Sequence, residues 1–542
     1  MRRARSALLA DALVLVLMIG CSCSSRTVVL LEDGPTAGPE QGLDARIDQP
    51  RGDLSTADLP RADLPGLPGS WAISAGGAGL SYSEGHRVAT DSAGNAYVSG
   101  VFSGTVTFGA TVLKSKGRDL FVAKVSPSGK FLWALGAGVP GEGVQWTNLA
   151  VDSKDNVYIT GYWTLYNTTN PTMAFGKEVV ELEKGHFYHL VAKVSPAGDV
   201  SWVAKVELAE DTRCWFSIGL GYKDSCPAIA VDGDGSTYIT SCFAKMATFG
   251  STVLTAATYG SNFFENVYVA RLSPSGSFQW AISSSSTNHD GAYGIAVDGS
   301  GNVIVAGGYA KKGLTTLGTT VLKPKEFGNL FLARVSPAGT FLSATSLGSA
   351  PSGFFTPQGF GLDSGGNAFL TGKVFNATIG SFPPANGSYV VKVSSAGTPL
   401  WVTSTGVWWV YFFDVAVDGT GAAHTTGSIW WQSSNKVTIG KTTLANSTGA
   451  HSDAVVVKTS PTGTIQSAFS STGTHSRDNV GSGARGFGIT LDSSDNTYVV
   501  GVFDGKVTFG STTLTSTLNN GIHRDNLFIW RIPAANGSDA GP

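Results

Sequence analysis

The residues of this chain best suited to binding or proton transfer lie in short segments that differ from one part of the sequence to the next. These segments are rich in tryptophan, phenylalanine, histidine and arginine. Aromatic rings offer large apolar faces to a sugar or a protein side chain, and histidine and aspartate can exchange protons near neutral pH. The candidate ligand-binding residues are Trp146, Trp215, His289, Asp290, Phe354, Phe355, Trp408, Trp409, His475 and Arg477.

Trp408 and Trp409 stand out among these residues because two further tryptophans, Trp430 and Trp431, follow them closely. The four rings could form an aromatic platform for a sugar or a protein. Alternatively, they fill space between packed sheets, since large rings dominate protein cores. The sequence leaves both interpretations open.

The candidate acid–base groups are His289 with Asp290, and His475 with Arg477 and Asp478. Nothing in their spacing brings them together, so solvated loop residues are the alternative. The sequence has no glycine-rich phosphate loop, no His/Cys cluster with metal-ligand spacing and no Gly-x-Ser-x-Gly turn. We therefore predict no catalytic residue, no metal and no cofactor. The formal net charge of −2 provides no basic surface for nucleic acid.

A second set of chemistry-bearing residues repeats seven times. In each copy an aspartate ends an apolar run and precedes a tight turn, and a base follows on a later apolar run. Calcium usually needs several carboxylates from one loop, whereas most copies offer one. We predict that each aspartate caps its own turn and that several pair with the base of their copy. The aspartates are Asp91, Asp152, Asp232, Asp298, Asp363, Asp418 and Asp492, and the bases are Lys124, Lys193, Arg271, Arg334, Lys392, Lys458 and Arg531.

The elements that must hold these groups are β-strands. In each copy two apolar runs flank the aspartate turn, a Thr/Val-rich hairpin follows, and two more runs flank a turn that is usually Ser-Pro-x-Gly. With 70 glycines, 14% charged residues and no long helical pattern, the chain has the composition of an all-β protein. Four strands in each of seven copies predict a seven-bladed β-propeller over residues 70–537.

The ends of the repeat region predict how the propeller closes. A fourth-strand motif, residues 70–73 (SWAI), precedes the first copy, and the last copy ends with its third strand near Pro533. The N-terminal strand should therefore complete the C-terminal blade. Such closure removes the free sheet edges that an open ring would leave.

The D-x-x-G-N hairpin and the KVSPSG turn resemble those of the bacterial seven-bladed β-propeller repeat proteins known as SBBP-repeat proteins. The resemblance covers nearly all of residues 71–533. It implies the propeller fold and an exported or surface protein, often a lipoprotein, mostly of unassigned activity. It transfers no functional residue to this chain.

Residues 1–20 have the basic start and the apolar run of an export signal. Residues 18–21 (MIGC) resemble the bacterial lipobox, which implies a lipid on Cys21, and Ser22 after it implies sorting to the outer membrane. An ordinary cleaved secretory signal is the alternative. Residues 21–69 are rich in proline and aspartate and predict a disordered linker, and residues 538–542 predict a flexible tail. We expect an outer-membrane lipoprotein that faces the periplasm or the cell surface.

Three cysteines, Cys214, Cys226 and Cys242, remain after the export region. An exported protein favours one disulfide among them. Cys226 and Cys242 lie at equal distances from a predicted turn and could pair across two strands. We slightly favour Cys214–Cys226, because this pair would restrain a long insertion.

The uniform turns at one end of the predicted strands contrast with diverse aromatic segments at the other end. This contrast favours a monomeric, non-enzymatic binding or scaffold module for a protein or polysaccharide of the cell envelope, attached to the membrane through its lipid alone. The alternative is a hydrolase or lyase at the mouth of the propeller channel, which would need several His, Asp, Glu or Arg side chains to converge. A third possibility is a structural spacer without a ligand.

Overall fold

The computed structural model consists of β-strands joined by turns and loops, with no helix in the part of the chain that it describes. Within that part, accordingly, no helix is long and apolar enough to cross a membrane. The described residues are 69–166, 171–209, 227–256, 258–259, 262–287, 289–309, 313–324, 327–350, 354–383, 385–431, 435–446, 450–474, 483–519 and 522–534.

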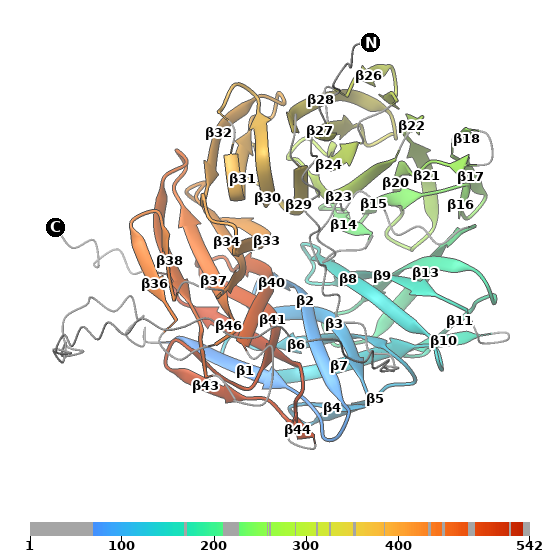
Figure 1. The fold of residues 1–542 in the computed structure, drawn as a ribbon. Helices are drawn as coiled ribbons and strands as arrows, with labels where there is room; N and C mark the ends of the chain where they lie inside the picture. The colour runs from blue at the N-terminus through green and yellow to red at the C-terminus, as the bar shows by residue number, and fades with distance from the viewer. Residues whose placement is uncertain are drawn as a thin grey trace, which may run out of the picture. The chain divides into compact units, whose positions relative to one another are not determined.

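In the described part of the chain, the strand pairs define a unit of four antiparallel strands that occurs seven times. Figure 1 shows how these strands are arranged. In the first unit, β2 (Tyr82–Thr90) pairs with β3 (Ala96–Ser103), β3 with β6 (Asp119–Val125), and β6 with β7 (Phe131–Gly138). The second and third strands are buried along almost their whole length. Strands packed on both faces have this near-continuous apolar sequence rather than an alternating one.

The six other units repeat this order of first, second, third and fourth strand. The second unit has β8 (Gly143–Val151), β9 (Val157–Thr164), β12 (Phe187–Val194) and β13 (Val200–Leu208). The third has β14 (Ala228–Val231), β15 (Thr237–Phe243), β20 (Asn266–Leu272) and β21 (Phe278–Ser283). The fourth has β23 (Asp290–Val297), β24 (Val303–Tyr309), β27 (Phe327–Val335) and β28 (Phe341–Ala350).

The last three units are equally complete. The fifth has β29 (Phe354–Leu362), β30 (Ala368–Ile379), β31 (Ala385–Val393) and β32 (Pro399–Ser404). The sixth has β33 (Val410–Val417), β34 (Ala423–Trp430), β37 (Ser452–Thr459) and β38 (Ile465–Ser470). The seventh has β40 (Gly483–Leu491), β41 (Thr497–Asp504) and β46 (Asn526–Ile532), with β1 (Trp71–Ala75) as its fourth strand.

In chain order, small hairpins lie between the second and third strands of six units, as predicted; in the fifth unit β30 instead runs on to Ile379, and no separate hairpin is described there. Their central glycines, from Gly109 to Gly510, have φ near +60°, a backbone conformation that favours glycine. They are β4–β5 (Thr105–Phe108, Thr111–Lys114), β10–β11 (Thr172–Phe175, Glu178–Glu181), β16–β17 (Met246–Phe249, Thr252–Thr255), β25–β26 (Thr315–Leu317, Thr320–Leu322), β35–β36 (Lys436–Ile439, Thr442–Ala445) and β42–β43 (Lys506–Phe509, Thr512–Thr515). The remaining short strands are β18 (Thr258–Tyr259), β19 (Asn262–Phe263), β22 (Ser285–Ser286), β39 (Thr472–Thr474), β44 (Leu518–Asn519) and β45 (Ile522–His523).

The predicted pairing of the two ends of the repeat region is confirmed. β1 runs antiparallel to β46, with Trp71 opposite Arg531 and Ala75 opposite Leu527. In Figure 1 the first strands of the chain therefore lie beside its last strands. The backbone groups of β46 thus have a partner strand on each side, β41 and β1.

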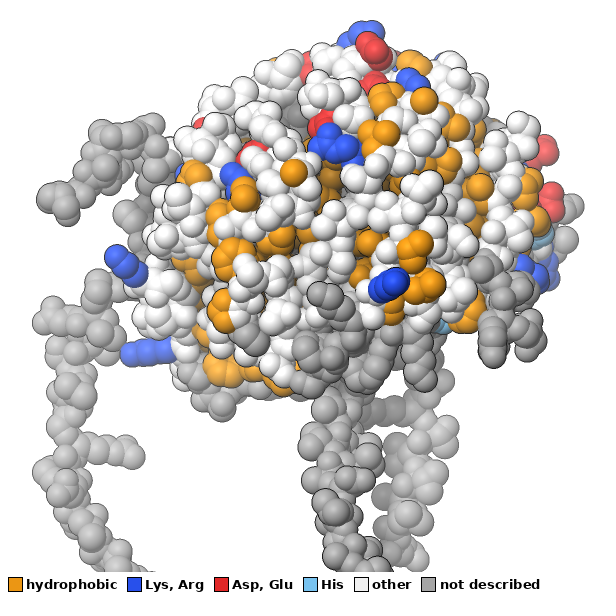
Figure 2. All heavy atoms as spheres, turned by 90° about the horizontal axis from the view of Figure 1, so that it is seen from above, with side chains coloured by type: hydrophobic (Ala, Val, Ile, Leu, Met, Phe, Trp, Pro, Cys, Tyr) orange, Lys and Arg blue, Asp and Glu red, His pale blue; other side chains and the backbone are white. Residues whose placement is uncertain are grey.

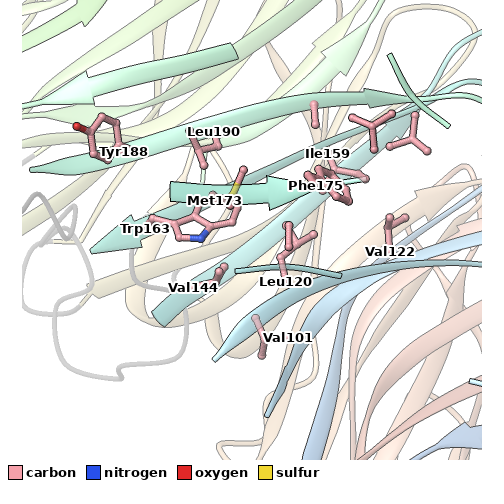
Figure 3. Packing of buried hydrophobic residues seen from close by; sticks show 14 of the residues in the cluster. Val101, Leu120, Val122, Val144, Ile159, Trp163, Met173, Phe175, Tyr188 and Leu190 are labelled. Atoms are coloured by element: carbon pink, nitrogen blue, oxygen red, sulfur yellow. The ribbon is translucent and has the colours of Figure 1, made fainter. Parts of the chain in front are cut away.

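The first strands of the units contact one another in chain order: β2, β8, β14, β23, β29, β33 and β40, and β40 in turn contacts β2. The apolar core lies between the sheets of consecutive units. Figure 3 shows one such core, in which Val101, Leu120 and Val122 of the first unit face Ile159, Phe175 and Leu190 of the second.

Candidate functional site

The repeated aspartates lie at one end of the strands, which we call the turn end. Asp91 Oδ1 accepts hydrogen bonds from the amides of Ala93 (3.0 Å) and Asn95 (2.8 Å), and Lys124 Nζ lies 3.0 Å from Asp91 Oδ2. The predicted capping and pairing are therefore confirmed. The base lies within 4 Å of the aspartate in five units: Asp91–Lys124, Asp152–Lys193, Asp298–Arg334, Asp363–Lys392 and Asp418–Lys458.

The opposite end of the strands, the variable end, carries the predicted ligand-binding segments, and the structure gives their residues different roles. Phe355 is fully buried in the core between the fourth and fifth units, which corrects the expectation that it faces a ligand. Trp409 packs partly buried against the core of the sixth unit. Both rings therefore fill space in the apolar core.

His289 and Asp290 are adjacent in sequence but have separate partners. His289 Nδ1 lies 3.3 Å from Glu265 Oε2, and this contact raises the pKa of His289. Asp290 is completely buried and accepts hydrogen bonds from Thr315 Oγ1 (2.8 Å) and Ser284 Oγ (3.3 Å). Burial raises the pKa of Asp290 to about 7. Asp290 therefore ties two loops together beneath the surface and is not presented to a ligand.

Several predicted residues lie outside the described part of the chain. Cys242 is described and takes part in a disulfide. Its partner is not a described residue, and the slightly favoured Cys214–Cys226 pair, which would leave Cys242 unpaired, does not account for this bond. The predicted residues outside the described ranges are Cys21, Cys214, Trp215, Cys226, His475, Arg477, Asp478 and the side chain of Phe354, together with residues 1–68 and 535–542.

Charged side chains of the first and seventh units meet at the variable end. We call Glu84, His86, Arg118, Arg485 and Asp525 the inner-strand cluster. Arg118 Nη2 lies 3.4 Å from Glu84 Oε2, and Arg485 Nη2 lies 4.0 Å from Asp525 Oδ2. These four charged side chains are between 22% and 41% exposed, so they are held by neighbours and still reach solvent. The charges on the side seen in Figure 2 stand singly or in small groups.

His86 is the buried support of the inner-strand cluster. The backbone N–H of Thr147 donates to His86 Nδ1 (3.2 Å), so the ring proton lies on Nε2, which is 3.5 Å from Glu84 Oε2. Burial lowers the pKa of His86 to about 4, although Glu84 opposes this shift. At neutral pH His86 is therefore an uncharged donor that orients Glu84.

The carboxyl groups of the cluster and of its neighbour Asp504 differ in their pKa values. Burial alone would raise the pKa of Glu84, but the hydrogen bond from His86 and the charge of Arg118 outweigh it and lower this pKa to about 2. Asp504, at the end of β41, has the opposite balance: burial and the neighbouring charge of Asp525 raise its pKa to about 7. Burial also raises the pKa of Asp525. The site thus holds one firmly ionised carboxylate and one that is partly protonated near neutrality.

A row of aromatic rings supports this charged cluster. Trp146 stacks on His86 with ring centroids 3.7 Å apart, and its edge meets Phe487 at 5.6 Å. Phe413 continues the row at 5.4 Å from Phe487, and the Arg485 guanidinium lies 5.8 Å from the centroid of Phe487. Trp146, predicted as a ligand contact, is 9% exposed and acts mainly as the floor of the site.

A second group at the variable end surrounds Lys373 of β30. Its ammonium lies 3.6 Å from the ring centroid of Tyr411 and 5.1 Å from that of Trp408, and Trp408 lies 4.9 Å from Phe375. Lys373 is only 4% exposed, and burial lowers its pKa to about 7. Trp408, another predicted ligand contact, therefore helps to enclose a lysine.

None of the cluster residues Glu84, His86, Arg118, Arg485 and Asp525 was predicted from the sequence. One signal was available: Glu84 and His86 interrupt an otherwise strand-like run in a chain with few charges. Their meeting with the seventh unit had no local signal, because it depends on the contact of β2 with β40. Among the described residues, no three His, Cys, Asp or Glu side chains gather closely enough to hold a metal ion.

Known proteins resemble this chain only distantly. No protein-family model matches it. An uncharacterized WD repeat-containing protein of Acanthamoeba polyphaga mimivirus is 26% identical over 301 residues, which cover 49% of this chain and 20% of that protein. The chain therefore matches only a fifth of that relative's length.

Two solved structures align over most of this chain. A polysaccharide lyase aligns with a TM-score of 0.41 and 8% identity, over 83% of this chain and 90% of the lyase. A protein of unknown function from Dyadobacter fermentans aligns with a TM-score of 0.33 and 10% identity, over 86% of this chain and 100% of that one. Similarity at this level does not indicate an activity, so function must be inferred from the site itself.

Proposed function

We propose that the chain is an exported, lipid-anchored, seven-bladed β-propeller that binds a protein or polysaccharide partner at the cell envelope through the inner-strand cluster. Seven four-stranded units, the β1–β46 pairing and the successive contacts of the first strands support the propeller. The export signal, the lipid on Cys21 and the resemblance to SBBP-repeat proteins rest on the sequence.

The observation that carries the binding role is the display of paired, partly exposed charges above an aromatic floor. Arg118 and Glu84 restrain each other, and Arg485 is placed between Phe487 and Asp525. Guanidinium groups held in this way can bind carboxylate or sulfate oxygens in two places, and ordered side chains lose little entropy on binding. An anionic polysaccharide or an acidic protein segment fits this display.

A binding screen tests the proposal. The chain from residue 21 with Cys21→Ser, which lacks the predicted export signal and the acylation site, would be screened against acidic and neutral envelope glycans and cell-surface proteins. We expect one acidic ligand to bind and Arg485→Ala to weaken it at least about tenfold. Lys114→Ala, which removes an exposed charge on the small hairpin of the first unit, is the matched control. Equal binding by Arg485→Ala and Lys114→Ala would exclude the inner-strand cluster as the site.

A hydrolase or lyase is the second candidate, because Asp504 and Asp525 have raised pKa values beside Arg485. A carboxyl group with a pKa near 7 can donate a proton at neutral pH, and a nearby guanidinium can stabilise developing negative charge. Incubation with acidic polysaccharides, followed by assays for new reducing ends and unsaturated products, tests this function. Products that depend on Asp504 and disappear in Asp504→Asn would favour it.

A further inference from the structure

A third arginine, Arg524, borders the inner-strand cluster and directly precedes Asp525. Its backbone is fixed, because the N–H of Arg524 donates to Thr517 O (3.0 Å) and the N–H of Ser83 donates to Asp525 O (3.0 Å). The Nε atom of Arg524 is buried and has no hydrogen-bond partner among the described residues. Buried polar atoms of folded proteins nearly always have a partner. Arg524 thus has an unused donor beside the candidate site.

Arg485 is the second guanidinium with donors to spare. Its Nη2 atom lies 4.0 Å from Asp525 Oδ2, which is too far for a hydrogen bond. The Arg485 side chain is 29% exposed, and its guanidinium lies 5.8 Å from the ring centroid of Phe487. A guanidinium that is held by a ring and only loosely paired keeps its N–H groups for an oxyanion.

Two carboxyl groups face these arginines. Asp504 Oδ1 accepts a hydrogen bond from the N–H of Gly483 (2.7 Å), and the charge of Asp525 acts on Asp504. An anion bound to Arg485 would add a third negative charge beside this pair. Neighbouring like charges disfavour the ionised form of a carboxyl group. One of the two carboxyl groups should therefore take up a proton when an anion binds.

The other ionisable groups around the pair keep their protonation state near neutrality. The pKa of Glu84 is about 2 and that of His86 is about 4, and burial raises the pKa of Tyr82 above its ordinary value. Arginine stays charged throughout this range. The groups that face the pair are Tyr82, Glu84 and His86 of β2, Arg118 before β6, Arg485 of β40, and Arg524. Among these described groups and the pair itself, only the pair titrates between pH 6 and pH 8.

The donors around Asp525 suit a tetrahedral oxyanion. Arg485, Arg524 and Asp504 come from different segments of the chain, and all three border Asp525. Because Oδ1 of Asp504 is bound to Gly483, its other oxygen can carry a proton and donate it. A sulfate or phosphate ester has three terminal oxygens, one for each donor group, whereas a carboxylate has two.

We propose that the site binds a sulfate or phosphate ester of an acidic polysaccharide together with one proton, with Arg485, Arg524 and the protonated carboxyl group of Asp504 as the donors. This inference rests on the proposed function, because it specifies the ligand group and the regulation of the same site. Since binding requires the proton on Asp504, the site holds its ligand in mildly acidic solution and releases it as the pH rises. An acidic protein segment offers carboxylates and fits the three donors less well.

Saturation-transfer NMR with glucose 6-sulfate tests the proposal, because this sulfate stays ionised from pH 6 to pH 8. The protein is the chain with Cys21→Ser that serves in the binding screen. Burial and the neighbouring charge of Asp525 raise the pKa of Asp504 to about 7. The protonated fraction of Asp504 therefore falls about tenfold between pH 6 and pH 8, and the Kd should rise about tenfold. An equal Kd at the two pH values, or no binding at pH 6, would overturn the proposal.

Two variants assign the donors. Arg524→Gln should raise the Kd at pH 6 at least about tenfold, because it removes a charged donor, and Lys114→Ala should leave the Kd unchanged. Asp504→Asn carries an amide that donates at every pH, so it should bind at pH 8 as the wild type binds at pH 6. Binding by Arg524→Gln that equals that of Lys114→Ala, or a tenfold pH dependence that persists in Asp504→Asn, would contradict the assignment. The comparison of the wild type at two pH values does not depend on the folding of a variant.

Glucose 6-phosphate and glucuronate at pH 6 distinguish the sources of the charge. Tighter binding of the sulfate or of the phosphate identifies the ester, and either result supports the proposal. Glucuronate binding that is as tight as both would overturn the tetrahedral assignment and favour a carboxylate ligand. The proposed function fails separately: an acidic ligand whose affinity depends on Arg485 but not on pH or Arg524 would keep the binding role and remove this inference.

Discussion

The two ends of the same strands differ in whether their contacts recur from unit to unit. At the turn end, the same groups meet in unit after unit: an aspartate caps its turn, a base pairs with it, and an indole donates to the next turn. At the variable end, the charged and aromatic contacts of the candidate site belong to single units, as with Glu84 and Arg118 or Lys373 and Tyr411. A contact repeated in most units serves the fold, which every unit needs, and a contact made in one place is free to serve a ligand.

The strongest way to break this comparison is to remove a turn-end aspartate. Asp91→Ala is expected to lower the free energy of unfolding by about 3 kcal/mol, because it leaves the Lys124 ammonium buried without its partner and two turn amides without an acceptor. Denaturant unfolding followed by fluorescence measures the effect, with Lys114→Ala as the control. A loss below about 0.5 kcal/mol would mean that the repeated pairs do not hold the turns.

Lys373 should behave in the opposite way, as a single charge that costs stability. Lys373→Met is expected to raise the free energy of unfolding by about 2 kcal/mol near pH 7, because the buried ammonium has no ion pair among the described residues. Burial lowers the pKa of Lys373 from 10.5 to about 7.

Between pH 7 and 10.5 the unfolded chain binds the extra proton at Lys373, so wild-type stability should rise with pH across that range. The gain from Lys373→Met should shrink accordingly. Unfolding curves of both proteins at pH 7 and pH 10 give the comparison. A gain that is constant with pH would show that the lysine is charged in the folded state throughout.

Asp290 should change the stability of the protein less than Lys373 does, and its contribution should fall rather than rise with pH. Burial raises its pKa from 3.8 to about 7, so its contribution to stability is complete below pH 3.8 and is lost as pH rises through 7. Asp290→Asn keeps an acceptor for Thr315 and removes the titration. We expect the wild type to lose roughly 1 kcal/mol relative to the variant between pH 4 and pH 8, measured by thermal unfolding. Parallel pH profiles would contradict this expectation.

Arg118 should give the smallest effect on stability. Its side chain is 30% exposed, and exposed ion pairs contribute about 0–1 kcal/mol. Arg118→Ala is therefore expected to unfold within about 0.5 kcal/mol of the wild type and to lose affinity for the ligand found in the binding screen. A variant that loses stability but retains affinity would show that Arg118 serves the fold, as the turn-end contacts do. The contrast between the two ends would then not hold for Arg118.

Much of the architecture could be predicted from the sequence because its causes are local. The aspartate turns follow from side chains that bond to their own backbone within four residues, as Asp91 does with Asn95. The four-strand order follows from runs with strand composition separated by tight turns. The pairing of β1 with β46 followed from a fourth-strand motif that had no third strand before it and a third strand that had no fourth strand after it.

The site could be predicted only in part, because it is assembled from distant segments. The sequence pattern indicated the variable end and favoured its aromatic residues. Of these, Phe355 lies in the core, and Trp146 and Trp408 lie against His86 and Lys373. The charged groups could not be predicted as one site because Glu84 and Arg118 belong to the first unit, whereas Arg485 and Asp525 belong to the last. No spacing in the sequence relates them.

The sequence by itself determined the strands, their turns, the strand order within each unit and the pairing of the chain's two ends, since these depend on hydrogen bonds and apolar patterns between near neighbours or matching motifs. Tertiary structure alone decided which charges of the first and seventh units share a site, and which rings are walls and which are core. These outcomes depend on how whole sheets pack against one another, and the fit between two sheets is a property of their combined surfaces.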